Sequence, residues 1–268
     1  MSHYPAAGIW TRCPACGRHV HQSQWGPWRQ CPYCQAWQRL SATERVAQLA
    51  DSGSFTALKS SVRSQDQLKF PNYATKLTQA QAKTGLDEAI ITGWATFDTW
   101  PAMLMVMDSH FMMGTLNTTV TRKIIAALQQ ARQRRVPVVI VTASGGARMQ
   151  EGLYALVGMN LILAELARFA AAKLPLVTVL TDPTMGGVSA SFAFKGDVIV
   201  AEAGAKIGFA GARVIQQTMP TSLPDDFQSA PSLRAHGQLD AVVVRPQLRA
   251  YLINVLANYQ QSGGPQHG

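Results

Sequence analysis

From residue 86 onwards, apolar runs alternate with segments whose apolar residues recur at helical spacing. The runs predict strands, and those at 136–142 and 174–180 are typical of strands buried on both faces. The predicted strands cover 89–97, 103–108, 136–142, 174–180 and 198–201. We expect a turn at Trp100-Pro101 to join the first two as a hairpin.

Four segments between and after these runs predict helices, at 120–134, 150–171, 188–194 and 245–260. In the first, one stripe is apolar, and in the last the inward positions include Leu248 and Leu252. Strands and helices that alternate in this order indicate βαβ units with mostly parallel pairing. The sequence therefore predicts an α/β fold for this part of the chain.

The stretch between residues 41 and 85 is less regular. Residues 41–50 predict a helix, with Ser41 as N-cap and Glu44 at the capping-box position. Residues 51–85 are polar and show little period, so we expect a connecting segment in which 75–83 is at most weakly helical.

Four cysteines dominate the N-terminal segment. Two Cys-x-x-Cys pairs, Cys13 with Cys16 and Cys31 with Cys34, are separated by fourteen residues. Two such turns form a closed set of four sulfur ligands, the pattern of a structural zinc site. Iron in a rubredoxin-like site uses the same geometry and is the alternative. We divide the chain into a zinc ribbon at 9–40 and a second domain at 41–268.

Charge and hydropathy narrow the class of protein. The formal net charge is +9, which suits acidic partners such as phosphorylated cofactors, acidic proteins or nucleic acid. Arginines and tryptophans of the ribbon can form a face for single-stranded nucleic acid, or the ribbon can be a lid on the main domain, which we favour. With no long apolar span and no signal peptide, we expect a cytoplasmic protein without membrane contact.

Two glycine-rich loops carry the candidate chemistry. One contains Gly145 and Gly146 after the strand at 136–142, and the other contains Gly186 and Gly187 after the strand at 174–180. Paired glycines let backbone N–H groups face outward without a Cβ in the way. Two such loops on neighbouring strands can converge on one oxygen, as an oxyanion hole for a thioester enolate requires.

Other chemistries find less support. Neither loop is a P-loop or a dinucleotide fingerprint, and Ser189 is not in a nucleophile elbow. His110, His236 and Asp108 do not form a recognisable nucleophile–base pair in the sequence. An enzyme that uses backbone donors, with a base carried by its substrate, fits this pattern.

The chain resembles the β subunits of bacterial acetyl-CoA carboxylase carboxyltransferases over nearly its whole length. The resemblance rests on the cysteine ribbon and on four longer strings: TASGGARMQEG (142–152), LTDPTMGGVSASFA (180–193), AE…IGFAGARVIQQT (201–218) and FQ…GQLD…VVRP (227–246). It implies a crotonase-like fold of ββα superhelical units. It also implies an α₂β₂ assembly with a separate α subunit, which acts with a biotin carboxyl carrier protein and biotin carboxylase.

The implied reaction transfers a carboxyl group from carboxybiotin to acetyl-CoA and gives malonyl-CoA, the first committed step of fatty acid synthesis. The resemblance implies that Gly186, Gly187, Gly145 and Gly146 form the catalytic loops. It places Arg148, Met185, Ser189, Gly208, Phe209 and Gly211 among the substrate-binding residues, and one structural Zn²⁺ on Cys13, Cys16, Cys31 and Cys34.

Two departures from the family pattern keep a second hypothesis open. Asn117 stands where relatives commonly have glycine, and Leu161 stands where they often have lysine. Both changes bear on the CoA site, and they fit a paralogue with weakened catalysis and an assembly or regulatory role. A third hypothesis is nucleic-acid binding through the basic ribbon.

Overall fold

The computed structural model describes residues 9–219 and 222–261. The chain divides into two compact units, Met1–Leu40 and Ser41–Gly268. In the first unit, β1 (Trp10–Arg12) pairs antiparallel with β2 (His19–His21), and the short helix η1 covers Gln22–Gln24.

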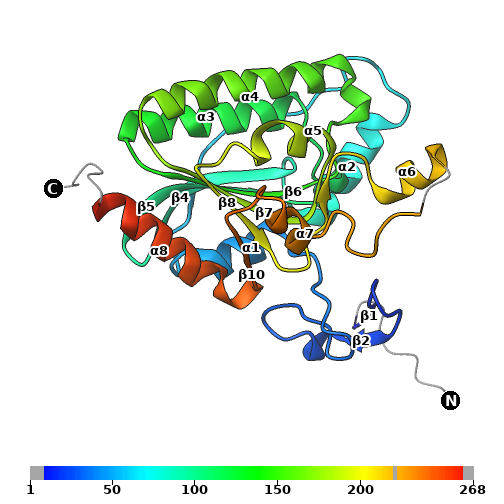
Figure 1. The fold of residues 1–268 in the computed structure, drawn as a ribbon. Helices are drawn as coiled ribbons and strands as arrows, with labels where there is room; N and C mark the ends of the chain where they lie inside the picture. The colour runs from blue at the N-terminus through cyan, green and yellow to red at the C-terminus, as the bar shows by residue number, and fades with distance from the viewer. Residues whose placement is uncertain (1–8, 220–221, 262–268) are drawn as a thin grey trace. The chain divides into compact units, whose positions relative to one another are not determined.

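The second unit is built on one eight-stranded sheet (Figure 1). Its strand order is β10-β8-β7-β6-β5-β4-β3, and β9 also pairs with β7. The strands are β3 (Thr56–Ala57), β4 (Ile90–Phe97), β5 (Trp100–Met107), β6 (Val138–Ser144), β7 (Leu176–Met185), β8 (Val198–Glu202), β9 (Ile207–Gly208) and β10 (Ala241–Val243). Pairing from β5 to β10 is parallel, as predicted, whereas β3, β4 and β5 pair antiparallel.

Helices cover both faces of the sheet (Figure 1). The longer helices α3 and α4 lie over one face, and α1 and α8 lie over the other. The helices are α1 (Ala42–Leu49), α2 (Tyr73–Thr84), α3 (Thr118–Arg134), α4 (Leu153–Ala171), α5 (Gly186–Val188), α6 (Ala212–Thr218), α7 (Ala230–Ala235) and α8 (Leu248–Gln261). Short helical turns are η2 (Met112–Gly114), η3 (Met149–Glu151), η4 (Ser189–Ala193) and η5 (Arg245–Gln247).

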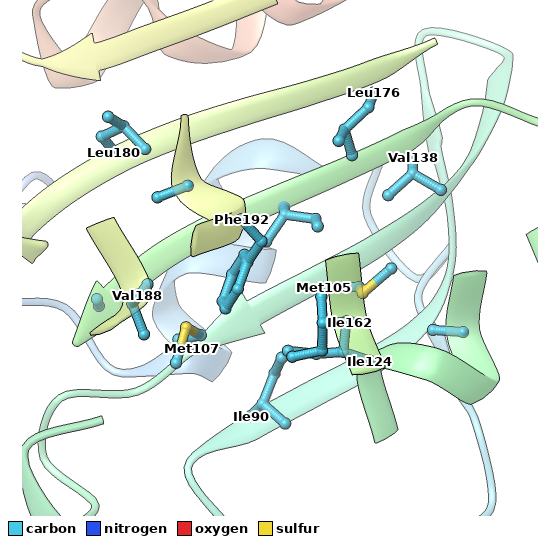
Figure 2. Close-up of a cluster of buried hydrophobic side chains, with 14 of the residues drawn as sticks. Ile90, Met105, Met107, Ile124, Val138, Ile162, Leu176, Leu180, Val188 and Phe192 are labelled. Atoms are coloured by element: carbon cyan, nitrogen blue, oxygen red, sulfur yellow. The ribbon is translucent and has the colours of Figure 1, made fainter. Parts of the chain in front are cut away.

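The central strands bury side chains on both faces because successive residues point to opposite sides. Met103 and Met105 of β5 join the core under α3 and α4, whereas Leu104 and Val106 join the core under α1 and α8. Figure 2 shows the first of these clusters, in which Phe192 lies among apolar side chains from the sheet and from both long helices.

Several predicted elements are confirmed, with small shifts at their ends. The predicted helix at 41–50 is α1, and Ser41 and Glu44 form the expected capping box. The helix predicted at 120–134 begins two residues earlier, at Thr118, because Asn117 caps it. The helix predicted at 150–171 is interrupted at Gly152, whose φ of 52° separates η3 from α4.

Two predictions about local structure are wrong. The hairpin turn lies at Asp98-Thr99, both with positive φ, and Trp100-Pro101 belongs to β5. The carboxylate of Asp51 accepts hydrogen bonds from the N–H groups of Asp98 and Thr99, so a distant side chain stabilises this turn.

The segment at 75–83 is part of α2, a regular helix of 12 residues rather than a weakly helical stretch. Tertiary contacts explain the difference. Tyr73 and Ala80 are buried, and the Tyr73 hydroxyl donates to the carboxylate of Glu151 over 2.7 Å.

Among the described helices, α4 alone is long and apolar enough to cross a membrane by length and composition. It also carries Glu165 and Arg168, and its buried positions, such as Ile162 and Phe169, pack into the core of the second unit. These features are typical of a core helix in a globular domain.

Candidate active site

The two glycine-rich loops lie side by side at the carboxyl ends of neighbouring strands. β6 and β7 pair in parallel up to Ser144 and Thr184, so the loops that follow start at the same end of the sheet, the carboxyl end of its parallel strands. A Cβ placed on Gly146 would lie 3.3 Å from the Cα of Gly186 and from the N of Gly187. A Cβ on Gly186 would lie 3.1 Å from the Cα of Gly146. The two backbones therefore touch, and only glycine allows this approach.

Three of the four glycine N–H groups are already engaged. Those of Gly145, Gly146 and Gly186 donate, respectively, to the carbonyl of Met113 (2.8 Å), the hydroxyl of Ser144 (3.0 Å) and the carbonyl of Phe209 (3.0 Å). The N–H of Gly187 differs, because Gly187 is the second residue of α5 and a helix cannot satisfy its first N–H groups internally. Gly187 is therefore the one of these four glycines with a donor left for a ligand.

A second free donor comes from Ala147, which the sequence did not single out. Leu116 forms a parallel bridge with Ala147, through the carbonyl of Gly146 and the N–H of Arg148. In this geometry the N–H of Ala147 points away from Leu116, and it has no hydrogen-bond partner among the described residues. Backbone donors leave no mark on residue type, so no sequence signal could have distinguished Ala147 from its neighbours.

Ala147 and Gly187 thus present two N–H groups from touching loops. A Cβ on Gly187 would lie 3.8 Å from the Cβ of Ala147. Two preorganised amide donors from neighbouring loops can bind one negatively charged oxygen without reorganisation, which is the requirement for stabilising an enolate. Gly146 and Gly186 serve the site by allowing the close approach of the two loops.

The structure corrects the expected role of Arg148. Its side chain is fully buried, and its guanidinium donates to Glu88 over 2.6 and 2.8 Å and to the hydroxyl of Thr115 over 3.0 Å. Burial lowers the pKa of Arg148, but the hydrogen bonds and charge of Glu88 outweigh it, and the pKa lies above the ordinary value. Arg148 cannot touch a substrate in this structure, and it anchors the loop that carries Ala147.

Asn117 belongs to the same buried network. Its side-chain oxygen accepts the N–H of Val120, which caps α3, and its amide donates to Glu88 over 3.0 Å and to Glu151 over 2.8 Å. Its φ is −138°, an ordinary extended value, so the backbone does not require glycine here. The departure at Asn117 therefore leaves the loop intact and adds polar contacts behind it.

The other predicted substrate-binding residues lie around β9 and the start of α5. Ser189 donates to the carbonyls of Gly186 and Gly208, over 2.9 and 2.7 Å, and so joins α5 to β9. Phe209 is 68% exposed, Met185 is half-buried, and Gly211 has open space beside it. Among these residues, Phe209 offers the largest accessible apolar surface for a ligand.

The histidine and aspartate that the sequence could not assemble do meet in the structure. His110 Nδ1 lies 2.9 Å from the buried carboxylate of Asp108, which also accepts the N–H groups of Ala42 and His110. Burial raises the pKa of Asp108, but these contacts outweigh it and hold the pKa below its ordinary value. The pair joins α1 to the loop after β5 and orients the His110 ring.

The four cysteines of the first unit gather at one point. Their sulfur atoms lie within 4.8 Å of one another, with 3.7 Å between Cys13 and Cys34 and 3.9 Å between Cys16 and Cys31. A tetrahedral zinc site with Zn–S bonds of about 2.3 Å has S–S edges of about 3.8 Å, so the cluster fits the metal.

The pKa values of two cysteines agree with this fit. Burial raises the pKa of Cys31, but backbone amides outweigh it and bring the pKa to about 7. The N–H of Ala36 lowers the pKa of Cys34, but burial and the three other thiols raise it to about 12. Four thiols this close resist joint ionisation, and a dication removes the conflict.

Fold and site together define an α/β protein in which backbone amides at the carboxyl edge of a parallel sheet can hold an anionic oxygen. A family model described as the carboxyl transferase domain matches residues 38–238. The chain belongs to this carboxyl transferase family.

Curated relatives agree with this assignment. Two proteins named acetyl-coenzyme A carboxylase carboxyl transferase subunit beta 1, from Lactiplantibacillus plantarum strains JDM1 and WCFS1, are 67% and 66% identical. Each match covers 97% of this chain and 97% of the relative. The resemblance seen in the sequence is thereby confirmed.

Solved structures share the fold at lower identity. The transcarboxylase 12S core, with hydrolysed methylmalonyl-coenzyme A bound, has a TM-score of 0.69 and 21% identity over 81% of this chain. The chain spans 41% of that transcarboxylase chain. A Pseudomonas malonate decarboxylase MdcD–MdcE heterodimer matches with a TM-score of 0.62, 22% identity and coverage of 82% of this chain and 86% of that chain. The predicted α/β, crotonase-like fold class is confirmed.

Proposed function

We propose that this chain is the β subunit of an acetyl-CoA carboxylase carboxyltransferase, and that it converts acetyl-CoA into malonyl-CoA in the cytoplasm. The pair of free N–H groups on Ala147 and Gly187 carries the proposal, together with the identity of 67% over 97% of a relative with that name. Carboxybiotin on a carrier protein supplies the carboxyl group, as CO₂, and the ureido nitrogen that accepts the methyl proton.

This chain contributes the electrostatic part of the reaction. Removal of a proton from the acetyl methyl group moves negative charge onto the thioester oxygen, and the N–H groups of Ala147 and Gly187 stabilise that charge. The enolate carbon then bonds to CO₂, and the carbonyl re-forms. No side chain of this chain has to act as a base, which agrees with the absence of a nucleophile–base pair among the described residues of the two loops.

A separate α subunit completes the enzyme, and we propose that it docks on the exposed face of α4. This face carries apolar side chains that a soluble protein would not leave open: Leu153, Tyr154, Leu156, Val157 and Leu161, each between 45% and 71% exposed. An apolar pocket of about 530 Å³ lies along it. The departure at Leu161 belongs to this surface, where leucine favours contact with a partner.

We further propose that the cysteine unit binds one structural Zn²⁺ rather than iron. Its buried apolar core consists of Val20 and Trp25 beside two of the cysteines, which is too small to fold without a metal. Cys13, Cys16, Cys31 and Cys34 would hold the ion, and its role would be structural because four thiolates leave no open position.

Co-expression with an α subunit tests the catalytic proposal. The purified complex is expected to form malonyl-CoA from acetyl-CoA and a carboxybiotin donor, whereas this chain alone is expected to be inactive. A well-formed complex without turnover would contradict the proposal. In that case, titration of the complex with acetyl-CoA tests the alternative, a paralogue with an assembly role, because such a paralogue would fail to bind acetyl-CoA.

A further inference from the structure

A second hollow, separate from the apolar pocket along α4, opens beside Ala147. Its volume is about 460 Å³. One wall is the face of α2 that carries Lys76, Gln79 and Lys83, and the lining also includes His110 and Thr115 from the segment after β5. Because Ala147 lies in its lining, a thioester whose oxygen binds the Ala147 N–H has this hollow directly next to it.

The wall formed by α2 is basic. Lys76, Gln79 and Lys83 are spaced by three and four residues, which places them on one face of the helix. Neither lysine side chain has an ion pair or hydrogen bond with another described residue, and the residues that line the hollow include no Asp or Glu. The nearest acidic groups in sequence are engaged elsewhere, since Asp87 pairs with Arg63 and Glu88 pairs with Arg148.

We propose that this hollow binds the phosphate-bearing end of the acyl thioester, with Lys76 and Lys83 contacting its phosphates. The inference rests on the proposed function, because it takes the thioester oxygen to lie at Ala147 and Gly187. Coenzyme A carries a pyrophosphate and a 3′-phosphate at the end of its pantetheine arm. A site for this phosphate-bearing end needs cations at a distance from the reacting carbonyl. The hollow beside Ala147 offers two such cations, Lys76 and Lys83, whereas the lining of the pocket along α4 offers one, Arg122.

The two lysines are tested by comparing substrates with and without the phosphates. The variant Lys76→Gln/Lys83→Gln, in complex with the α subunit, is assayed with acetyl-CoA and with acetyl-pantetheine. We expect the KM for acetyl-CoA to rise about tenfold, because charge-assisted contacts at a part-exposed site are each worth a few-fold. The KM for acetyl-pantetheine and the kcat for both substrates are expected to stay within about twofold, since the oxyanion donors are untouched.

A matched control removes the same charge elsewhere. Lys173 and Lys195 are exposed and lie just before the start of β7 and β8, at the amino ends of these strands and away from the glycine loops. The variant Lys173→Gln/Lys195→Gln is expected to leave both KM values unchanged. An equal rise for acetyl-CoA in the control would show a general charge effect and would overturn the proposal, as would an equal effect of the Lys76→Gln/Lys83→Gln change on both substrates.

The proposed function and this inference fail in different ways. If the wild-type complex does not turn over acetyl-CoA, the proposed function is wrong. The phosphate site is then judged by calorimetric titration of CoA itself into the wild-type full chain and the Lys76→Gln/Lys83→Gln variant. Weaker binding to the variant supports the site, and equal or absent binding to both proteins overturns it.

Discussion

At the scale of single residues, the candidate site depends on the close approach of two backbones. Gly146 has a φ of 117°, and a Cβ on it would lie 3.3 Å from the N of Gly187. A side chain at residue 146 would therefore push the second loop away and separate the donors of Ala147 and Gly187. Gly146 and Gly186 matter for geometry, and the free donors are the N–H groups of the next residues, Ala147 and Gly187.

We expect Gly146→Ala to lower the kcat of the assembled enzyme roughly a hundredfold, the effect of losing one oxyanion donor. Gly53→Ala is the matched control, because the φ of Gly53 is also positive, at 73°, and a Cβ on it meets nothing within 4 Å. Steady-state rates and thermal unfolding of both variants provide the measurement. Activity of Gly146→Ala within a few-fold of wild type, with the fold intact, would show that the loops can separate without loss of function.

A second residue-scale prediction concerns the buried pair behind the loop. Glu88→Gln would leave the guanidinium of Arg148 buried without a counter-charge, so we expect the free energy of unfolding to fall by about 3–5 kcal/mol. Asp87→Asn, one residue away, removes an exposed pair with Arg63 and is expected to change it by less than about 1 kcal/mol. Urea unfolding of the two variants measures the difference, and similar losses in both would refute the role of burial.

At the scale of elements, the cysteine unit is a pair of matching turns. In each, the first cysteine accepts the N–H of the residue four positions later, Gly17 or Gln35, and that residue has a positive φ of 72° or 60°. β1 and β2 have three residues each and are too short to be stable alone. We therefore expect the folding of this unit to depend on an ion that links its four sulfur atoms.

We expect the purified chain to contain one zinc ion and Cys31→Ser to contain less than half of that, because three thiolates bind zinc more weakly than four. Removing the ion is expected to unfold residues 9–40, while the second unit, with its own core, stays folded. Elemental analysis and amide NMR spectra report the two effects. His19→Ala serves as control and should keep the metal, and a ribbon that stays folded without any ion would contradict the assignment.

At the scale of the whole molecule, the second unit is asymmetric in how it covers its apolar surface. The face of the sheet under α1 and α8 is closed by those helices (Figure 1). The helix α4 buries one side and exposes a row of apolar residues on the other. Interfaces that form permanent complexes have such apolar centres. This exposed row is the structural reason to expect a partner.

We expect Leu161→Glu, at a position 52% exposed, to weaken binding to the α subunit at least about tenfold, because a carboxylate would be buried unpaired in the interface. Gln129→Glu adds the same charge on the exposed side of α3 and should leave binding unchanged. Sedimentation of mixtures at equal concentration measures complex formation. Unchanged assembly of Leu161→Glu would place the interface elsewhere on the molecule.

Much of the fold could be read from residue patterns. Apolar runs located the central strands, the capping box placed α1, and the cysteine spacing placed a cluster of four sulfur atoms. Elements held by distant contacts were missed or misplaced. The apolar stripe of α2 is short, with Tyr73, Leu77 and Ala80, and Tyr73 is held by Glu151. The hairpin turn at Asp98 depends on Asp51. Local pattern does not encode such partners, because they lie far away in the chain.

For the site, the sequence by itself determined which loops matter, since only glycine permits the conformations and the contact found at Gly146 and Gly186. Tertiary structure alone decided which groups remain for a ligand. In the folded chain, three of the glycine N–H groups donate hydrogen bonds within the protein, whereas those of Ala147 and Gly187 remain free. Arg148 is buried against Glu88. The reason is physical: a backbone donor is the same in every residue, so its availability depends only on what the folded chain places opposite it.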